Sequence, residues 1–308
     1  MPSAAAENSK DPLAPTDSTR DLSSAIRLDH VAIAVEKWSD AWPRYVGMLG
    51  GTWAAGGFNV GFSPHQLRFS NEGRLEVLQP WNWMENDFLR RFLDNNGPGP
   101  HHITFKVTDI NKSLEAVRRM KLEPVGVNFD DPGWKEAFLH PREACGVVVQ
   151  LAQASGGWES SPAPEGFPMN RGRLRAERAA FVRITHAVAD LSAALDLFSG
   201  LLRGEVVGRY ESPDESWECV DIAWSEPPGL RVVAPSSRSN DEGSLREWLG
   251  GRPGRVHHLV FSGSDSRPPT TPGEFGSVPG VMAGEHVTAV IEPAENLGTR
   301  LVLVGGAP

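Results

Sequence analysis

The chain has 308 residues, which is enough for two domains that each bury a hydrophobic core. Its net charge of −9 argues against a protein that binds nucleic acid or anionic membranes, because both partners are themselves negatively charged. Its two cysteines give no disulfide framework, and neither a signal-peptide pattern nor an apolar run of roughly 18 residues is visible. We therefore expect a cytoplasmic globular protein with neither a nucleic-acid nor a membrane partner.

The first folded unit follows a polar tail. Residues 1–25 lack hydrophobic periodicity and are predicted to be disordered. Residues 28–35, Leu-Asp-His-Val-Ala-Ile-Ala-Val, predict a buried strand, and residues 37–49 place large apolar side chains at helical spacing, with Pro43 in the first turn. Short strands are then expected at 58–62, 66–70 and 74–79. This unit is therefore a βαβββ module.

The same order of elements returns after a short helix (86–94) and a Gly/Pro-rich stretch (96–100). A strand begins at His102, and residues 109–121 have an apolar face at helical spacing. Strands are expected near 124–128, 136–140 and 146–152. Residues 26–153 are thus predicted to form one domain of two βαβββ modules.

Residues 154–178 are rich in Gly, Ser and Pro at first and basic later, from Arg171 to Arg178, which predicts a solvated interdomain linker. The same pattern resumes over residues 179–308, with strands at 181–188, 205–210, 217–224 and 229–234 and a helix at 191–202. A fourth module begins at His258, but 264–280 is too rich in Ser, Pro and Gly for a helix, and only strands 286–292 and 299–304 follow. The predicted fold class is α+β, with four βαβββ modules paired into two domains.

Four polar residues occupy matching places in the first two modules. His30 and His102 lie in the first strands, and Glu76 and Gln150 lie in the last strands, each among apolar neighbours. Alternate residues of a strand share a face, so these side chains can lie side by side. A buried polar group is costly unless it is paired, and one divalent metal ion bound by all four would satisfy them together. Of the tandem pair His101 and His102 we choose His102, because it directly precedes the apolar strand as His30 does.

These motifs resemble the vicinal oxygen chelate (VOC) superfamily of glyoxalases, bleomycin resistance proteins and dioxygenases. Residues 27–153 are most similar to methylmalonyl-CoA epimerases, and the similarity is carried by 29–35, 75–80, 101–105 and 138–151. The resemblance implies that each domain is a curved mixed sheet that forms a cleft, and that 179–308 is a degenerate VOC domain. It also implies a divalent cation, Zn, Ni, Co, Mn or Fe, held by His30, Glu76, His102 and the side chain at position 150.

Gln150 departs from the family pattern. The last ligand in epimerases and glyoxalase I is usually a glutamate that is linked to proton transfer. An amide can bind a metal through its carbonyl oxygen but cannot act as a base near neutral pH. Glu76 is then the only carboxylate of the set and the candidate catalytic residue. The alternatives are a base elsewhere in the chain or a reaction other than epimerisation.

The matching positions of the second half are read as His186, Arg231, His258 and Val302. Both histidines survive in this alignment, but the oxygen ligands do not. An arginine at a ligand position repels a cation. We therefore expect a metal-free copy that supports the first half, closes a cavity or mediates a homodimer.

The resemblance implies a metal-dependent epimerase, isomerase or glyoxalase-type lyase that stabilises the enolate of a small bidentate oxygenated substrate, with acyl-CoA thioesters among the candidates. An extradiol-type ring-cleaving dioxygenase is the alternative, since two histidines and one carboxylate also form the facial triad of Fe(II) oxygenases. A non-catalytic ligand-binding protein of the bleomycin-resistance type is a third, which the complete ligand set disfavours. The loop with Trp81, Trp83 and Met84 either packs under the second half or contacts substrate.

Overall fold

The computed structural model describes residues 26–155, 162–169, 177–214, 216–236, 244–263, 278–282 and 284–305. The predicted disordered tail 1–25 lies outside the described residues. So do 156–161 and 170–176 of the predicted linker, and residues 264–277, where a lost helix was expected.

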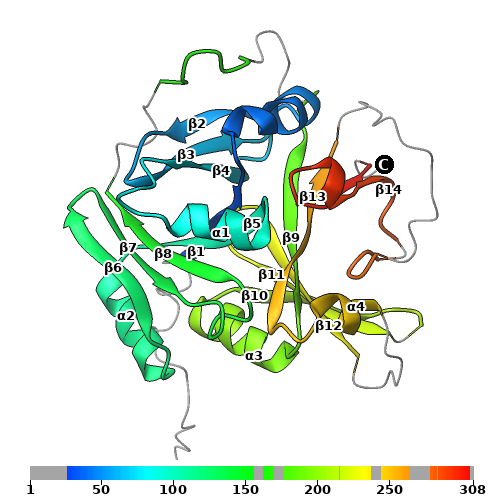
Figure 1. Cartoon of the computed structure of the whole chain (residues 1–308). Coiled ribbons are helices and arrows are strands. Elements are labelled where there is room, and N and C mark those ends of the chain that lie inside the picture. Colours follow the sequence, from blue (N-terminus) through cyan, green and yellow to red (C-terminus); the bar gives the residue numbers. More distant parts are fainter. Residues whose placement is uncertain are drawn as a thin grey trace, which may run out of the picture.

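The N-terminal half is an eight-stranded mixed sheet with the order β2-β3-β4-β1-β5-β8-β7-β6 (Figure 1). Its strands are β1 (Ile26–Ala34), β2 (Thr52–Gly56), β3 (Gly61–Arg68), β4 (Arg74–Trp81), β5 (Gly99–Val107), β6 (Pro124–Asp131), β7 (Trp134–Leu139) and β8 (Val148–Ala154). The pairs β1–β4 and β5–β8 are parallel, and the other neighbours are antiparallel. The helices are a 3-10 turn (Trp38–Ala41), a π-helix (Trp42–Met48), α1 (Phe88–Asn96) and α2 (Ile110–Arg119).

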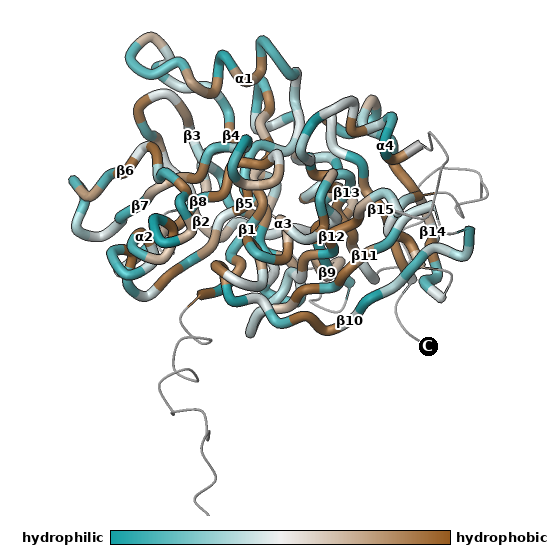
Figure 2. Tube along the Cα trace, turned by 90° about the horizontal axis from the view of Figure 1, so that it is seen from below, coloured by the Kyte–Doolittle hydropathy of each residue, from teal (hydrophilic) through white to brown (hydrophobic). Residues whose placement is uncertain are grey.

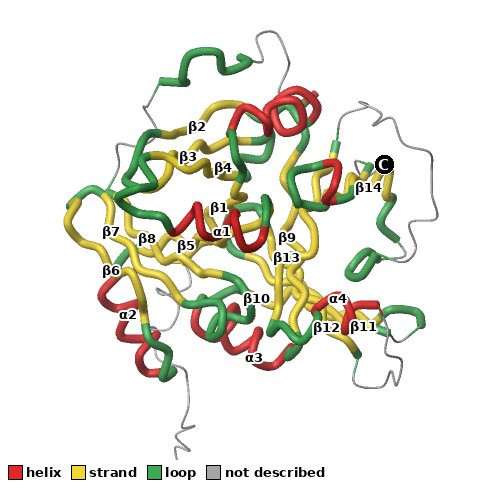
Figure 3. Tube along the Cα trace, in the orientation of Figure 1, coloured by secondary structure: helices red, strands yellow, loops and turns green. Residues whose placement is uncertain are grey.

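The C-terminal half repeats this plan in a seven-stranded sheet with the order β10-β11-β12-β9-β13-β15-β14. Strands predominate over helices in both halves (Figure 3). Its strands are β9 (Ala180–Val188), β10 (Glu205–Glu211), β11 (Trp217–Ala223), β12 (Gly229–Pro235), β13 (Gly254–Ser262), β14 (Val287–Ile291) and β15 (Leu301–Val304). The helices are α3 (Leu191–Leu195), which continues as a π-helix (Asp196–Leu201), α4 (Ser244–Leu249) and a 3-10 turn (Pro293–Glu295). The predicted α+β class with two curved mixed sheets is confirmed, and only two strands follow β13 in the described part of the fourth module.

The strands after the first helix differ from the prediction. They are 52–56 and 61–68, whereas 58–62 and 66–70 were expected. Pro64 lies within β3, although proline cannot donate to a neighbouring strand. In β3 this is tolerated, because the pairing with β2 ends one residue away and Gly57 N donates to Pro64 O at 3.1 Å. The expected place of Pro43, in the first turn of its helix, is confirmed.

The core lies between the two sheets and the helices that flank them, where the apolar segments of the strands gather in Figure 2. Phe69, Phe181 and Phe261 come from both halves, with ring centroids 4.9 Å apart for Phe69–Phe261 and 4.7 Å apart for Phe181–Phe261. Gly146, at φ 84°, lies against Gly254 so closely that a Cβ atom would overlap the opposing backbone. The two halves therefore share one hydrophobic core, and the opposite face of each sheet is left for other contacts.

Two residues in the described parts of the predicted linker contact the first module, although most of their neighbours in the linker are exposed. Arg178 donates to Gly50 O, Thr52 Oγ1 and Arg68 O at 2.9, 3.0 and 2.7 Å, so the prediction of a solvated basic run is wrong at this residue. Phe167 is buried against three tryptophans of the first module. In the ranges that the structure describes, no helix has the length and apolarity that a membrane crossing requires.

Candidate metal centre

The register of three strands brings His30, Glu76 and His102 to one face of the N-terminal sheet. Ala32 on β1 lies opposite both Glu76 on β4 and His102 on β5. His30 is two residues before Ala32 and therefore points to the same side. The other side of β1 carries Val31, which is part of the core. The three polar side chains thus meet away from the core, as the sequence pattern predicted.

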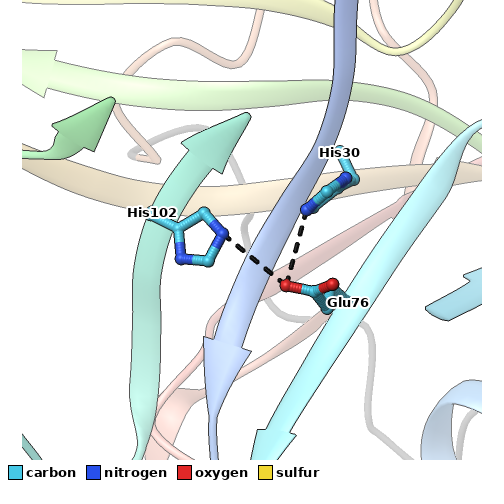
Figure 4. Close-up of side chains that lie close together, drawn as sticks. All are labelled: His30, Glu76 and His102. Carbon is cyan, nitrogen blue, oxygen red and sulfur yellow. Dashed lines mark ion pairs between the residues drawn. The ribbon is translucent and has the colours of Figure 1, made fainter. Parts of the chain in front are cut away.

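These side chains point toward one another (Figure 4). Glu76 Oε2 lies 3.5 Å from His30 Nε2 and 3.6 Å from His102 Nε2. One ligand atom from each residue lies within 4.8 Å of the others, and all three residues are buried. This spacing suits a single ion between the three ligand atoms.

Neighbouring groups fix the orientation of both imidazole rings. Asp29 Oδ2 accepts from His30 Nδ1 at 2.8 Å, and the Nδ1 atoms of His101 and His102 share a hydrogen bond of 2.8 Å. Both Nε2 atoms therefore face Glu76. His102 Nε2 has no hydrogen-bond partner among the described residues. A buried nitrogen without a partner is costly, and a metal ion would satisfy it.

Burial and neighbouring charges shift the pKa values of His30, Glu76 and His102. Burial alone would lower the pKa of His30, but the charges of Glu76 and Asp29 raise it. Burial would raise the pKa of Glu76, and the charge of His30 lowers it instead. Burial, together with His101, holds the pKa of His102 well below its usual value. Glu76 is thus ionised and His102 neutral, which are the forms that bind a cation, whereas the two carboxylates hold His30 protonated, with a pKa of about 9, so that His30 must lose a proton when a cation binds.

Gln150 lies beside this cluster and is held at both ends. Its Oε1 accepts from Thr104 Oγ1 at 2.6 Å, and Thr104 Oγ1 lies 3.0 Å from His30 Nε2. Its Nε2 donates to Glu136 Oε2 at 2.7 Å. Glu136 was not among the predicted site residues, although it alternates with Phe138, which lies opposite Gln150 on β7. That alternation was the available signal for a second carboxylate at this site.

The C-terminal sheet repeats the register with different side chains. Thr185 on β9 lies opposite both Arg231 on β12 and His258 on β13. Ala32 has the same two-sided pairing in the N-terminal sheet. Val302 on β15 stands at the place of the fourth ligand, by the pairing of β13 with β15. Three of the four equivalences read from the sequence therefore agree with the strand pairing.

The fourth equivalence is wrong. Arg183, rather than His186, corresponds to His30, because each precedes by two residues the position that is paired on both sides. His186 faces the other side of β9, where its Nε2 lies 2.8 Å from Cys145 O. The two positions differ by three residues, and any odd shift moves a side chain to the opposite face of a strand. The second half therefore keeps one histidine at these positions, not two.

Ion pairs occupy the face of the C-terminal sheet where the N-terminal sheet has its cluster. Arg231 makes two contacts of 2.6 Å to Asp221, and its Nη1 lies 3.1 Å from Glu285 Oε1. Arg183 Nη2 contacts Glu285 Oε2 at 2.7 Å. Two buried arginines and two carboxylates thus neutralise one another, and His258 beside them has its pKa lowered by burial and by His257.

The aromatic loop after β4 does not pack under the second half. Trp81 and Trp83 are about half exposed, at 47% and 49%, and Met84 is 87% exposed. The first of the two interpretations of this loop is therefore wrong. A groove of about 770 Å³ lies elsewhere, along α2 and the end of the π-helix after α3, and none of the cluster residues lines it.

Comparisons with known proteins relate the first half to one superfamily. Residues 29–138 match the model of the glyoxalase/bleomycin resistance protein/dioxygenase superfamily. The chain is 32% identical over 135 residues to the mitochondrial methylmalonyl-CoA epimerase of Homo sapiens. The aligned region covers 42% of this chain and 74% of that protein. It is 30% identical over 142 residues to the uncharacterized protein YqjC of Bacillus subtilis, covering 42% of this chain and 94% of that protein.

The fold of a larger part of the chain is similar to a solved enzyme structure. A mutant of 4-hydroxymandelate synthase from Streptomyces coelicolor superposes with a TM-score of 0.57 and covers 79% of this chain and 72% of that chain. The sequence identity is 14%, so this similarity concerns the fold. It extends over more of the chain than either half alone contains.

Proposed function

The chain belongs to the glyoxalase/bleomycin resistance protein/dioxygenase superfamily, and we propose that it is a metal-dependent isomerase or lyase. It would hold a divalent cation through His30, Glu76, His102 and Gln150 and act on a small substrate with two neighbouring oxygens. The observation that carries the proposal is the buried cluster of ligand atoms within 4.8 Å of one another.

The donor set fits a divalent cation. Two imidazole nitrogens, one carboxylate and one amide oxygen are a mixed set that Zn, Ni, Co, Mn and Fe all accept. The unpartnered His102 Nε2 is costly without an ion. When bound, the cation supplies Lewis-acid chemistry, because it polarises a substrate carbonyl and stabilises the negative charge that develops when a neighbouring C–H bond loses its proton.

The chain's own residues would orient the ligands and move the proton. Asp29 accepts from His30 Nδ1, which leaves Nε2 as the ligand atom. We assign proton transfer to an oxygen of Glu76, the only carboxylate of the four. Its lowered pKa makes Glu76 a better ligand than base, so a variant at this position decides the assignment.

Similarity to methylmalonyl-CoA epimerase makes a 2-methyl acyl-CoA thioester the first substrate to test. In D₂O, the purified protein with one equivalent of Zn²⁺ or Co²⁺ should exchange the α-hydrogen of methylmalonyl-CoA, as followed by NMR. Glu76→Gln should abolish exchange. Exchange retained in this variant would remove Glu76 as the base. Less than about a tenth of an equivalent of bound metal after supplementation would contradict the site itself.

A ring-cleaving oxygenase is the second candidate, because two histidines and one carboxylate around one point also form the ligand set of Fe(II) oxygenases. Oxygen uptake by the Fe(II)-loaded protein on catechols, without hydrogen exchange on thioesters, would favour it. Metal-bound protein that does neither would favour a ligand-binding role. A homodimer stays a prediction, which sedimentation velocity can check.

A further inference from the structure

Glu136 on β7 makes the contact that decides how Gln150 is presented. Gln150 Nε2 donates to Glu136 Oε2 at 2.7 Å, and Trp134 Nε1 donates to the same oxygen at 2.9 Å. Glu136 is half-buried, and Gln150 is 7% exposed. The hydrogen bond between them therefore lies in a partly desolvated place, where a charged acceptor has a strong effect.

This contact distinguishes the two ends of the amide. An ionised carboxylate can only accept, so Glu136 binds the NH₂ group of Gln150 and not its carbonyl. The carbonyl oxygen must then point the other way, to Thr104 and the His30 side of the cluster. The oxygen is the atom of an amide that can bind a cation, so Glu136 turns the correct end of Gln150 toward the ligand atoms.

A similar pair stands at the other side of the cluster, with the groups exchanged. Gln66 on β3 donates through Nε2 to Glu76 Oε1 on β4 at 3.1 Å. There the inner strand carries the carboxylate and the outer strand carries the amide. On β7 and β8 the inner strand carries the amide and the outer strand carries the carboxylate. Each side of the cluster thus has one amide–carboxylate pair.

We propose that Glu136 is a positioning residue that makes the Gln150 amide a metal ligand. In this pair the carboxylate lies on β7 and the amide on β8, which is the reverse of the arrangement on β3 and β4. This inference rests on the proposed metal site and deepens it. Glu136 does not touch the ligand atoms of His30, Glu76 or His102 and acts through Gln150. The carboxylate that the family pattern puts at position 150 is, in this chain, one strand further out.

The test measures metal affinity with no reaction involved. Zn²⁺ dissociation constants are determined at pH 7.5 by competition with a chromophoric chelator, and Co²⁺ absorption spectra report the coordination sphere. The variants are Glu136→Gln, the exchange Glu136→Gln/Gln150→Glu, and Glu123→Gln. The last removes the same charge from an exposed side chain just before β6 and serves as the matched control. Thermal melting confirms that each variant is folded.

We expect Glu136→Gln to weaken Zn²⁺ binding by roughly 10- to 100-fold, as for other residues that orient a ligand, and to change the Co²⁺ spectrum. The new amide at position 136 can donate or accept, so the amide of Gln150 is no longer fixed. The exchange variant restores the hydrogen bond with its direction reversed, and its affinity should return to the wild-type value or exceed it. Glu123→Gln should bind as the wild type does.

Two results overturn the inference alone. The first is wild-type affinity and an unchanged Co²⁺ spectrum in Glu136→Gln. The second is an exchange variant that binds no better than Glu136→Gln. A wild-type protein that binds no metal overturns the proposed function and, with it, the role of Glu136, so the two failures are distinguishable.

Discussion

The two sheets place different chemistry on the same framework. In the N-terminal sheet, the positions around Ala32 carry a carboxylate and two histidines whose Nε2 atoms converge. In the C-terminal sheet, the positions around Thr185 carry arginines. Strand pairing thus brings equivalent positions together in both sheets. The side chains at these positions decide whether they can bind a cation.

The charges at these positions are inverted. Glu76 accepts from Gln66 across β3 and β4, whereas Arg231 donates to Asp221 across the corresponding strands β11 and β12. Glu285 then bridges Arg231 and its neighbouring arginine. His102 Nε2 in the N-terminal cluster and His258 Nε2 in the C-terminal one both lack a hydrogen-bond partner among the described residues. The two sites differ in the charge beside these nitrogens: a carboxylate lies beside His102, whereas arginines paired with protein carboxylates lie at the matching place in the second half.

The largest expected effect is on metal affinity, when a histidine of the N-terminal cluster is removed. His102→Ala should weaken Zn²⁺ binding by roughly 1,000-fold, about 4 kcal/mol, because a buried ligand is lost. His258→Ala, at the equivalent place in the C-terminal sheet, should leave the affinity unchanged. Isothermal titration calorimetry measures both. Equal losses in the two variants would mean that the second half takes part in metal binding.

The next effect is on stability and belongs to the second half. Arg231→Ala leaves Asp221 and Glu285 without their shared cation and should lower the free energy of unfolding by about 3 kcal/mol. Metal affinity should not change. Urea denaturation monitored by tryptophan fluorescence gives the stability. A loss below about 0.5 kcal/mol, the range of ordinary surface substitutions, would show that the ion pairs do not hold this half together.

A smaller effect appears in the pH dependence of stability. Burial alone would raise the pKa of Glu285, but Arg183 and Arg231 lower it below the usual 4.5. A carboxylate with a lowered folded pKa stabilises the protein above its unfolded pKa, and this contribution is lost as the pH falls through the folded pKa. Glu285→Gln should cost roughly 2 kcal/mol at pH 7.

The gap between wild type and Glu285→Gln should then close as the pH falls below 4.5, the ordinary carboxyl value. Chemical denaturation at a series of pH values checks this. Parallel stability curves for the two proteins down to about pH 3 would contradict a lowered pKa at Glu285.

Much of the fold and the core of the candidate site follow from local patterns in the sequence. His30, Glu76 and His102 stand out because each is a polar residue in an apolar strand, and the repeated module puts them in register. The resemblance to the superfamily, recognised from the same motifs, is confirmed.

The remaining errors concern relations between strands. His186 was matched to His30 because each is a histidine in the first apolar strand of its half, yet the pairing of β9 with β12 and β13 selects Arg183. Register is set by distant partners, and a shift such as this one, of three residues, cannot be seen in the sequence of a single strand. Glu136 was missed for a similar reason, since it reaches diagonally to Gln150 rather than lying opposite it. Arg183 and Glu136 each change the chemistry of the sheet that carries them.

An anomalous-difference map from crystals grown with Zn²⁺ tests the central claim most directly. The account predicts one strong peak in each chain, bounded by His30 Nε2, Glu76, His102 Nε2 and Gln150 Oε1, and none beside Arg231. The absence of a peak at the first position, or a peak at His258 in its place, would contradict it.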